Sequence, residues 1–487
     1  MQENKAALLL ITCVLAVAAV TLAACSKKTP GTSTPPPTSS ASPTTTLPPT
    51  SPIPTGTAPP TPVIPTLTPP AALIGSRSTL NSTEYVVFAW NDLGMHCANP
   101  TYDRLVLLPP YNTVWAQVLR RGNPPQVVTS GLTVEYKIIN NTYTYGKGGY
   151  GQFWDNARKL FGIDLVRDTG LNLVDPNIHN GLSGTMVAKT GYFIAAGIPL
   201  SPINDDGTWN PFQIAQITVK DASGKTVAQT VATAPVSDEI NCARCHGADA
   251  FTDILRKHDA SNATNLLASQ PVLCASCHGD PALGAAKGAT KYLSDAIHGF
   301  HATVDPQPVC YDCHPGQVTQ CARSLAHTAA DGNCQACHGS LAQVSSSIAA
   351  GRVPWASEPK CVTCHPNVAE VDTQATLYRN ATGHGGVYCA SCHSSPHAMV
   401  PTRIQLDNYQ ALQYEGAAKS IGSCGACHPS SRGQGAGGDF LEEHGGTNPR
   451  VPSACSICHT SVPANTAQWP HAFQWRATPG TGTVRGD

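Results

Sequence analysis

The chain has 487 residues, a formal net charge of −1 and only 13% charged residues. It lacks the surplus of basic residues that nucleic-acid-binding proteins carry, so we expect no nucleic-acid partner. The length is sufficient for more than one domain. Cysteine, at 20 residues, and histidine, at 18, are abundant for a protein with so few charges.

Residues 1–24 have the features of a secretory signal peptide. An apolar run from Ala6 to Ala24 follows Lys5 and ends in Leu-Ala-Ala-Cys. A segment of this length is typical of a removed signal, and an uncleaved membrane helix is the alternative. The ending resembles a bacterial lipobox. That resemblance implies cleavage before Cys25, lipidation of its sulfur and a membrane-anchored protein outside the cytoplasm, at the cell surface, outer membrane or periplasm.

Residues 25–78 form a tract made almost wholly of Thr, Pro, Ser, Gly and Ala. Such a composition cannot bury enough apolar surface to fold, so we predict a disordered stalk. Its prolines favour an extended chain, which lets roughly 45 residues reach on the order of 100 Å.

Residues 79–237 predict an all-β module. Runs of β-branched and aromatic residues predict strands at 85–90, 113–119, 132–139, 213–220 and 226–232. The last two flank Asp-Ala-Ser-Gly-Lys, which is typical of a hairpin turn. Residues 152–161 predict a helix. Several short strands separated by turns favour a β-sandwich, for which an immunoglobulin-like topology is one candidate.

The segment Asn91–Cys97 (NDLGMHC) has two interpretations. It is a structured loop, which we favour, or a metal or haem-capping site contributed by the β module. Cys97 and Cys321 are the thiols that no signal or repeated motif explains. Because disulfides form outside the cytoplasm, a Cys97–Cys321 bond joining the module to the rest of the chain is a hypothesis.

Residues 238–487 contain eight copies of Cys-x-x-Cys-His, each typical of covalent c-type haem attachment. One helical turn presents both sulfurs to one porphyrin edge, and the next residue then lies beneath the iron. The cysteine pairs are Cys242 and Cys245, Cys274 and Cys277, Cys310 and Cys313, Cys334 and Cys337, Cys361 and Cys364, Cys389 and Cys392, Cys424 and Cys427, and Cys455 and Cys458. The histidines that follow them are His246, His278, His314, His338, His365, His393, His428 and His459.

Zinc knuckles and disulfides also use Cys-x-x-Cys, but neither needs a histidine directly after it. Histidine occupies 18 of 487 positions, so a chance histidine there is expected in about one motif in 27. All eight motifs have one. Residues 238–487 therefore resemble the multihaem c-type cytochromes over about half the chain, which implies eight covalent c-type haems.

A second set of histidines supplies enough ligands for the other side of each iron. Residues 238–487 hold sixteen histidines for eight motifs, whereas methionine is scarce. Two imidazoles per iron predict low-potential haems suited to electron transfer. The candidate distal ligands are His258, His298, His301, His327, His384, His397, His444 and His471. His298 and His301 are one helical turn apart, so they can serve two different haems.

Successive motifs are 24 to 36 residues apart, which leaves little chain to build a core of its own. We therefore expect an octahaem domain of short helices and long loops in which cofactors replace apolar side chains.

The favoured function is electron transfer outside the cytoplasm, through eight mostly bis-histidine haems, to a redox partner protein or an extracellular acceptor. End-to-end assembly into a filament is one version of it. The first alternative is a multihaem oxidoreductase that acts on a small nitrogen or sulfur compound at an iron with an open position. The second is a binding or surface-interaction protein based on the β module. No catalytic residue is predicted, because a carrier leaves the redox chemistry to its cofactor.

Overall fold

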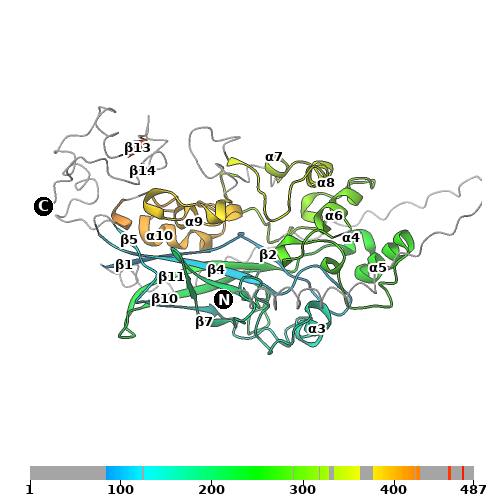
Figure 1. Ribbon diagram of the computed structural model, residues 1–487, viewed down its shortest axis with the longest axis horizontal. Coiled ribbons are helices and arrows are strands. Elements are labelled where there is room, and N and C mark those ends of the chain that lie inside the picture. The colour runs from blue at the N-terminus through cyan, green and yellow to red at the C-terminus, as the bar shows by residue number, and fades with distance from the viewer. Residues whose placement is uncertain are drawn as a thin grey trace, which may run out of the picture.

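A computed structural model describes residues 84–122, 125–288, 290–316, 318–327, 334–361, 377–422, 424–427, 459–461 and 474–475. Two facing sheets form a β module that ends at Ser237, and short helices and loops follow from Ala243 (Figure 1). This confirms the predicted all-β module followed by a part built from short helices. The predicted signal (1–24) and stalk (25–78) lie outside the described residues. Within the described ranges, no helix combines the length and apolar character needed to span a membrane.

The first sheet has the strand order β1-β4-β9-β8, with β5 paired beside β4. Its strands are β1 (Tyr85–Asn91), β4 (Asn112–Arg120), β5 (Gln126–Val127), β8 (Val187–Lys189) and β9 (Tyr192–Ile198). Strands β1 and β4 coincide with predicted strands. The sequence analysis missed β9, because its two alanines and a glycine are poor strand formers.

The second sheet has the order β2-β11-β10-β6-β7. Its strands are β2 (His96–Cys97), β6 (Thr133–Ile139), β7 (Ser183–Thr185), β10 (Phe212–Lys220) and β11 (Thr226–Ser237). Strands β10 and β11 form the predicted hairpin, which the bond from Asp221 N–H to the Lys225 carbonyl closes at 2.9 Å. The predicted helix is α3 (Gly151–Phe161). An immunoglobulin-like connectivity stays a prediction.

The part that carries the repeated motifs consists of short helices (Figure 1). They are α4 (Ala243–His246), α5 (Ala250–Asn262), α6 (Leu293–His301), α7 (Cys334–His338), α8 (Leu341–Ala349), α9 (Cys389–His393) and α10 (Tyr409–Glu415). Helices α9 and α10 lie over the first sheet, whereas α4, α5 and α6 lie to the right of β2 in Figure 1, with α7 and α8 above α6. A two-residue parallel pairing of β3 (Leu105–Val106) with β12 (Val272–Leu273) also joins the two parts.

Strands β1 and β4 are buried on both faces. Alternate residues such as Val87 and Ala116 pack toward the second sheet, in the core of the β module. The residues between them, including Phe88, Trp90 and Trp115, pack in a second core. That second core also contains Tyr378, Tyr388 and Ala390 of the motif-bearing part. Because neighbouring strand residues point to opposite faces, one sheet supports two cores, and the two parts of the chain share an apolar interior.

Gln117, in β4, fastens the segment that leads into α9. Its side chain is fully buried, with 0% exposure. The amide nitrogen donates to the carbonyl of Gly386 at 3.1 Å, and the amide oxygen accepts from the backbone N–H of Tyr388 at 3.0 Å and from the Ser391 hydroxyl at 3.1 Å. These bonds satisfy backbone groups that the interface removes from water.

Replacing Gln117 with methionine keeps the side-chain volume but leaves those buried polar groups unpaired. We expect Gln117→Met to lower the free energy of unfolding by about 3 kcal/mol. The measurement is guanidinium unfolding of the purified protein followed by circular dichroism. Gln126→Met, at an exposed position of β5, is the matched control and should change it by less than about 0.5 kcal/mol. Equal effects of the two substitutions would contradict the proposed fastening.

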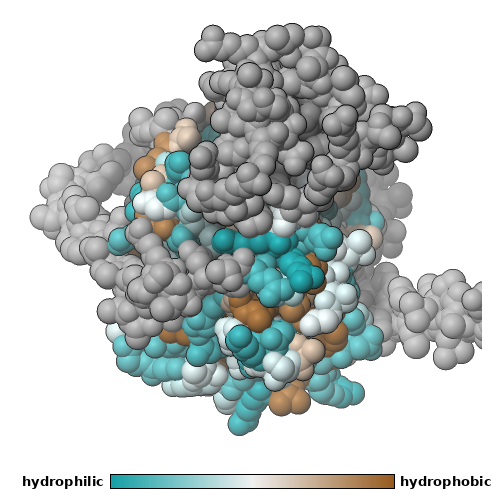
Figure 2. Space-filling model, turned by 90° about the vertical axis from the view of Figure 1, so that its left-hand side faces the viewer, coloured by the Kyte–Doolittle hydropathy of each residue, from teal (hydrophilic) through white to brown (hydrophobic). Residues whose placement is uncertain are grey.

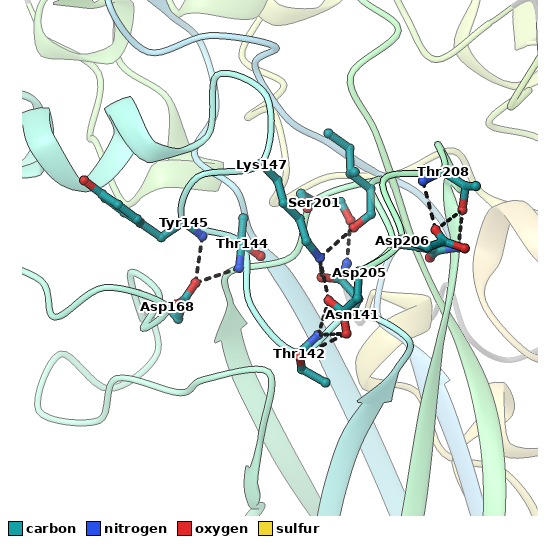
Figure 3. Close-up of polar contacts among 12 residues, drawn as sticks. Asn141, Thr142, Thr144, Tyr145, Lys147, Asp168, Ser201, Asp205, Asp206 and Thr208 are labelled. Atoms are coloured by element: carbon teal, nitrogen blue, oxygen red, sulfur yellow. Dashed lines mark hydrogen bonds and ion pairs between the residues drawn. The ribbon is translucent and has the colours of Figure 1, made fainter.

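A buried ammonium group joins two loops at one end of the β module (Figure 3). The side chain of Lys147 is 4% exposed. It donates to the Asn141 side-chain oxygen at 2.9 Å, the Ile203 carbonyl at 3.0 Å and Asp205 Oδ1 at 2.8 Å. All three N–H donors therefore have acceptors, as a buried charge requires.

The surface of the described residues is mixed in character. At the end where β1 and β5 lie, hydrophilic residues predominate, with small separate hydrophobic areas (Figure 2). Large exposed apolar side chains occur in both parts. In the motif-bearing part they include Phe300, Val309 and Leu325, each within two residues of a motif cysteine or a candidate histidine ligand.

Candidate haem-binding sites

The described motifs each adopt a single helical turn, as the attachment chemistry requires. In three motifs the same backbone hydrogen bond closes the turn: the histidine N–H donates to the carbonyl of the first cysteine. The distances are 2.9 Å for His246, 3.0 Å for His278 and 2.9 Å for His314. The motifs at Cys334–His338 and Cys389–His393 coincide with α7 and α9. Each turn places two cysteines beside a histidine on a short, locally ordered segment.

Most of the described motif cysteines have free thiols, which thioether bonds to haem require. These are Cys242, Cys245, Cys274, Cys310, Cys313, Cys334, Cys337, Cys361, Cys389, Cys392 and Cys427. Cys277 is the exception, since it is disulfide-bonded. Attachment of haem at that residue requires this disulfide to be absent.

Eight histidines of the described region meet in four pairs, and each pair joins a motif histidine to a predicted distal ligand. The ring centres are 6.5 Å apart for His246 and His301, 6.3 Å for His278 and His258, 6.0 Å for His314 and His298, and 6.1 Å for His338 and His397. Among the described residues, no group of three or more His, Cys, Asp or Glu side chains comes together that could hold a bare metal ion.

The spacing of these pairs fits two ligands on opposite sides of one iron. A metal–nitrogen bond is about 2 Å long and the nitrogen lies about 1.1 Å from the ring centre, so the ring centres of two such ligands lie about 6 Å apart. Four distances between 6.0 and 6.5 Å match this requirement. The residues present therefore fit a haem at each of the four pairs.

Hydrogen bonds orient these rings with Nε2 free. Nδ1–H of His298 donates to the Ser294 carbonyl at 2.7 Å, and Nδ1–H of His301 donates to the Ile297 carbonyl at 2.8 Å. A carbonyl can only accept, so the proton is on Nδ1 and the lone pair is on Nε2. Six of the eight paired histidines have an Nδ1 partner: His246, His258, His278, His298, His301 and His397. Such partners fix the orientation of metal-binding histidines.

The NDLGMHC segment is a structured loop, as favoured, and it also orients a candidate ligand. The Leu93 carbonyl accepts from Nδ1–H of His397 at 2.9 Å. Gly94 has a φ of +95°, and a Cβ there would lie 3.2 Å from the backbone nitrogen of His397. Asp92 binds His96 Nε2 at 2.9 Å. The loop thus needs glycine both for its backbone conformation and for its close approach to the histidine.

A buried ion pair holds this loop against the motif-bearing part. Arg323 is 1% exposed and bonds both carboxylate oxygens of Asp407, at 2.7 and 3.1 Å. Its remaining terminal nitrogen donates to the Gly94 carbonyl at 2.6 Å. The guanidinium therefore links the loop that orients His397 to residues that precede α10.

Helix α6 contributes one histidine to each of two pairs, as the three-residue spacing of His298 and His301 predicts. Gly299, between them, lets α8 approach closely, because a Cβ there would lie 2.7 Å from Ser345 Oγ. The same serine hydroxyl donates to buried Asp295 at 2.5 Å. Packing of α8 thus fixes the rotation of α6 and, with it, the directions of both histidines.

The surroundings keep several candidate ligands neutral, which is the form that binds a metal. Desolvation, with the neighbouring histidines adding to it, lowers the pKa of His314 and that of His338 to about 4. Both residues nonetheless keep exposed surface. Desolvation also lowers the pKa of His258, His298 and His397.

Contacts between motifs show which of them are neighbours. Arg244, in the first motif, forms an ion pair with Asp312, in the third. The thiol of Cys310, in the third motif, is hydrogen-bonded to that of Cys334, in the fourth. Motifs far apart in the chain therefore lie side by side, as closely spaced redox centres require.

The remaining predicted ligands are only partly described. His393 Nδ1 lies 2.9 Å from the Ser420 hydroxyl, and His327 is exposed. For His384, Cys424 and His459 the backbone alone is described, and the backbone of His459 lies in β13 (His459–Ser461), paired with β14 (Gln474–Trp475). Seven predicted haem-binding residues lie outside the described ranges: Cys364, His365, His428, His444, Cys455, Cys458 and His471.

The predicted Cys97–Cys321 disulfide is wrong for this structure, in which both residues are free thiols. Burial is the main cause that raises the pKa of the Cys97 thiol, and the nearby thiol of Cys321 raises it further. Noncovalent contacts hold the segments instead. Ser237, paired with Cys97 in the sheet, is hydrogen-bonded to the Thr319 hydroxyl at 3.0 Å.

Comparison with known proteins agrees with the geometry. Residues 348–429 match the family model described as cytochrome c7 and related cytochrome c. This segment of the motif-bearing part is thus similar to multihaem c-type cytochromes. The matched segment includes α9 and α10, and the family binds c-type haem covalently. A comparison of the whole chain with curated protein sequences finds no match.

Sequence reasoning missed the groups that orient the ligands. The carbonyls of Ser294 and Ile297 lie four residues before His298 and His301, so recognising the helix would have found them. The Leu93 carbonyl lies 304 residues from His397, and no pattern in the chain links the two.

If His298 and His301 serve different irons, each His→Ala substitution should convert one low-spin haem to a high-spin haem, and the double substitution should convert two. Electron paramagnetic resonance of the oxidised protein measures this, because loss of one axial ligand changes the spin state. His179→Ala is the control, since His179 lies in the β module and contacts the Gly170 carbonyl. Conversion of a single haem by the double variant would contradict the assignment.

Proposed function

We propose that this protein is a membrane-anchored electron carrier outside the cytoplasm, with eight covalent c-type haems that pass electrons to a redox partner or an extracellular acceptor. The match to a multihaem cytochrome family supports the electron-transfer role at a coarse level. The number of haems follows from the eight motifs of the sequence. When bound, haem supplies reversible one-electron chemistry at iron.

The observation that carries the proposal is the pairing of motif histidines with distal histidines at 6.0 to 6.5 Å. A pair of imidazoles fills both axial positions, so these sites offer a substrate no iron position to bind. Low-spin centres with two fixed imidazoles change little on reduction, which suits electron transfer better than substrate chemistry. This favours a carrier over the oxidoreductase alternative.

The protein's own residues contribute spacing, orientation and burial. The first sheet anchors the segment around α9 through Gln117, and Arg323 anchors the loop that orients His397. The ion pair of Arg244 with Asp312 holds the first and third motifs together, and Cys310 of the third motif lies beside Cys334 of the fourth. Sites that lie close together can exchange electrons without a partner between them.

Haem count and spin state test this function together. We expect the intact mass of the mature protein to include eight haems, and the oxidised protein to show low-spin signals throughout. A smaller number of haems would refute the octahaem proposal. A high-spin, five-coordinate signal in the unmodified protein would instead favour the oxidoreductase. The same mass measurement under native conditions tests end-to-end assembly, which requires multiples of the protomer mass.

The membrane anchor rests on the lipobox at Leu22–Cys25 and on the proline-rich stalk after it. We expect Cys25→Ser to release the haem-loaded protein into the soluble fraction, because the sulfur that carries the lipid is lost. The measurement is fractionation followed by haem staining. Cys13→Ser is the matched control, since Cys13 lies in the segment that cleavage removes. Retention of the Cys25→Ser protein in membranes would contradict lipid anchoring.

A further inference from the structure

One candidate ligand differs from the others in the group that holds its ring. His246 Nδ1 lies 2.8 Å from Oδ2 of Asp253, a carboxylate on α5. Two cations of the same helix keep this carboxylate charged. Lys257 Nζ lies 2.6 Å from Oδ2, and Arg256 lies 3.5 Å from Oδ1. Asp253 therefore presents a negative charge to the far side of an imidazole that pairs with His301.

The other described ligand candidates with an Nδ1 partner have neutral partners. Backbone carbonyls serve four of them: Ser294 for His298, Ile297 for His301, Lys291 for His278 and Leu93 for His397. Hydroxyl groups serve the other two, Thr264 for His258 and Ser420 for His393. Among the four described histidine pairs, a direct carboxylate contact is thus particular to the site of His246 and His301.

The charge of the partner alters how strongly the imidazole donates electrons to iron. A carboxylate that accepts the Nδ1 proton makes the ring more basic than a carbonyl or hydroxyl does. A more basic axial ligand stabilises the oxidised, more positive iron relative to the reduced one. Partner groups of this kind are among the means by which a protein sets a reduction potential.

We propose that Asp253 is a positioning residue that lowers the reduction potential of the site formed by His246 and His301 below that of the other described pairs. The proposal rests on the proposed function, because it requires haem at this pair. The step concerned is the gain of one electron by ferric iron to give ferrous iron, with the electron supplied by the donor used in the titration.

The site of His246 and His301 shares its two helices with neighbouring histidine pairs. Helix α5 carries both Asp253 and His258, which belongs to the neighbouring pair with His278. Helix α6 carries both His301 and His298, which belongs to the pair with His314. The site of His246 and His301 therefore shares a helix with each of two other pairs. If its reduction potential is lower than theirs, electrons reside on those two pairs in preference to this one.

The test compares three variants of the full haem-loaded protein by spectroelectrochemical titration. Asp253→Asn keeps the shape and an oxygen acceptor but removes the charge. It should raise the potential of one haem, with at least a tenfold change in its reduction equilibrium constant, which is 59 mV for a one-electron couple. Lys257→Gln removes a competing cation and should shift one haem in the opposite direction. Ser420→Ala, which removes a neutral partner from His393, should give a shift less than a third as large.

Haem content and spin state, measured on the same samples, separate the two levels of failure. If the unmodified protein lacks haem or shows high-spin iron, the proposed function fails first. If every sample is fully loaded and low-spin but the Asp253→Asn titration superimposes on that of the unmodified protein, only this inference fails. Should Asp253→Asn not fold, the direction of the Lys257→Gln shift decides, and an upward or absent shift overturns the proposal.

Discussion

Two imidazoles can bind the same iron only if a nitrogen of each points at it from opposite sides, which sets the ring centres about 6 Å apart. In this protein that requirement determines which segments must be neighbours. The pair of His246 and His301 brings α4 to the end of α6, and the pair of His338 and His397 brings α7 to residues that follow α9. Ligand pairing therefore acts as the long-range contact that an apolar core supplies in other small folds.

Such pairs need a rigid support, because segments of about 30 residues cannot build one. The β module provides it. Its first sheet is buried on both faces, and the outer face packs against Tyr378, Tyr388 and Ala390. Gln117 adds hydrogen bonds to the same segment, and Arg323 connects the loop at Leu93 and Gly94 with Asp407. The module is thus part of the architecture of the motif-bearing part, since its loop orients one candidate ligand, His397, and its sheet packs against the segment around α9.

The sequence was sufficient for the local features. Motif spacing predicted the helical turns, the hairpin at Asp221–Lys225 followed from its turn residues, and the three-residue spacing of His298 and His301 predicted ligands for two sites. It could not assign a distal histidine to each motif, because the separations range from 16 residues for His298 and His314 to 59 for His338 and His397. The hypothesis of a covalent link between Cys97 and Cys321 is not met either, since burial and hydrogen bonds such as that from Arg323 to the Gly94 carbonyl hold the two parts instead.

The roles of Leu93 and Asp253 could not be predicted either, since they depend on how rings are oriented within the fold. A backbone carbonyl carries no sequence signal, and an aspartate on a surface helix is ordinarily a solvated residue. What distinguishes Asp253 is its contact with the imidazole of His246, at 2.8 Å. An experimental structure of the haem-loaded protein tests the central claim most directly. The account predicts one iron between each of the pairs His246–His301, His278–His258, His314–His298 and His338–His397. An iron at any of these motifs with a different distal ligand, or with none, would contradict it.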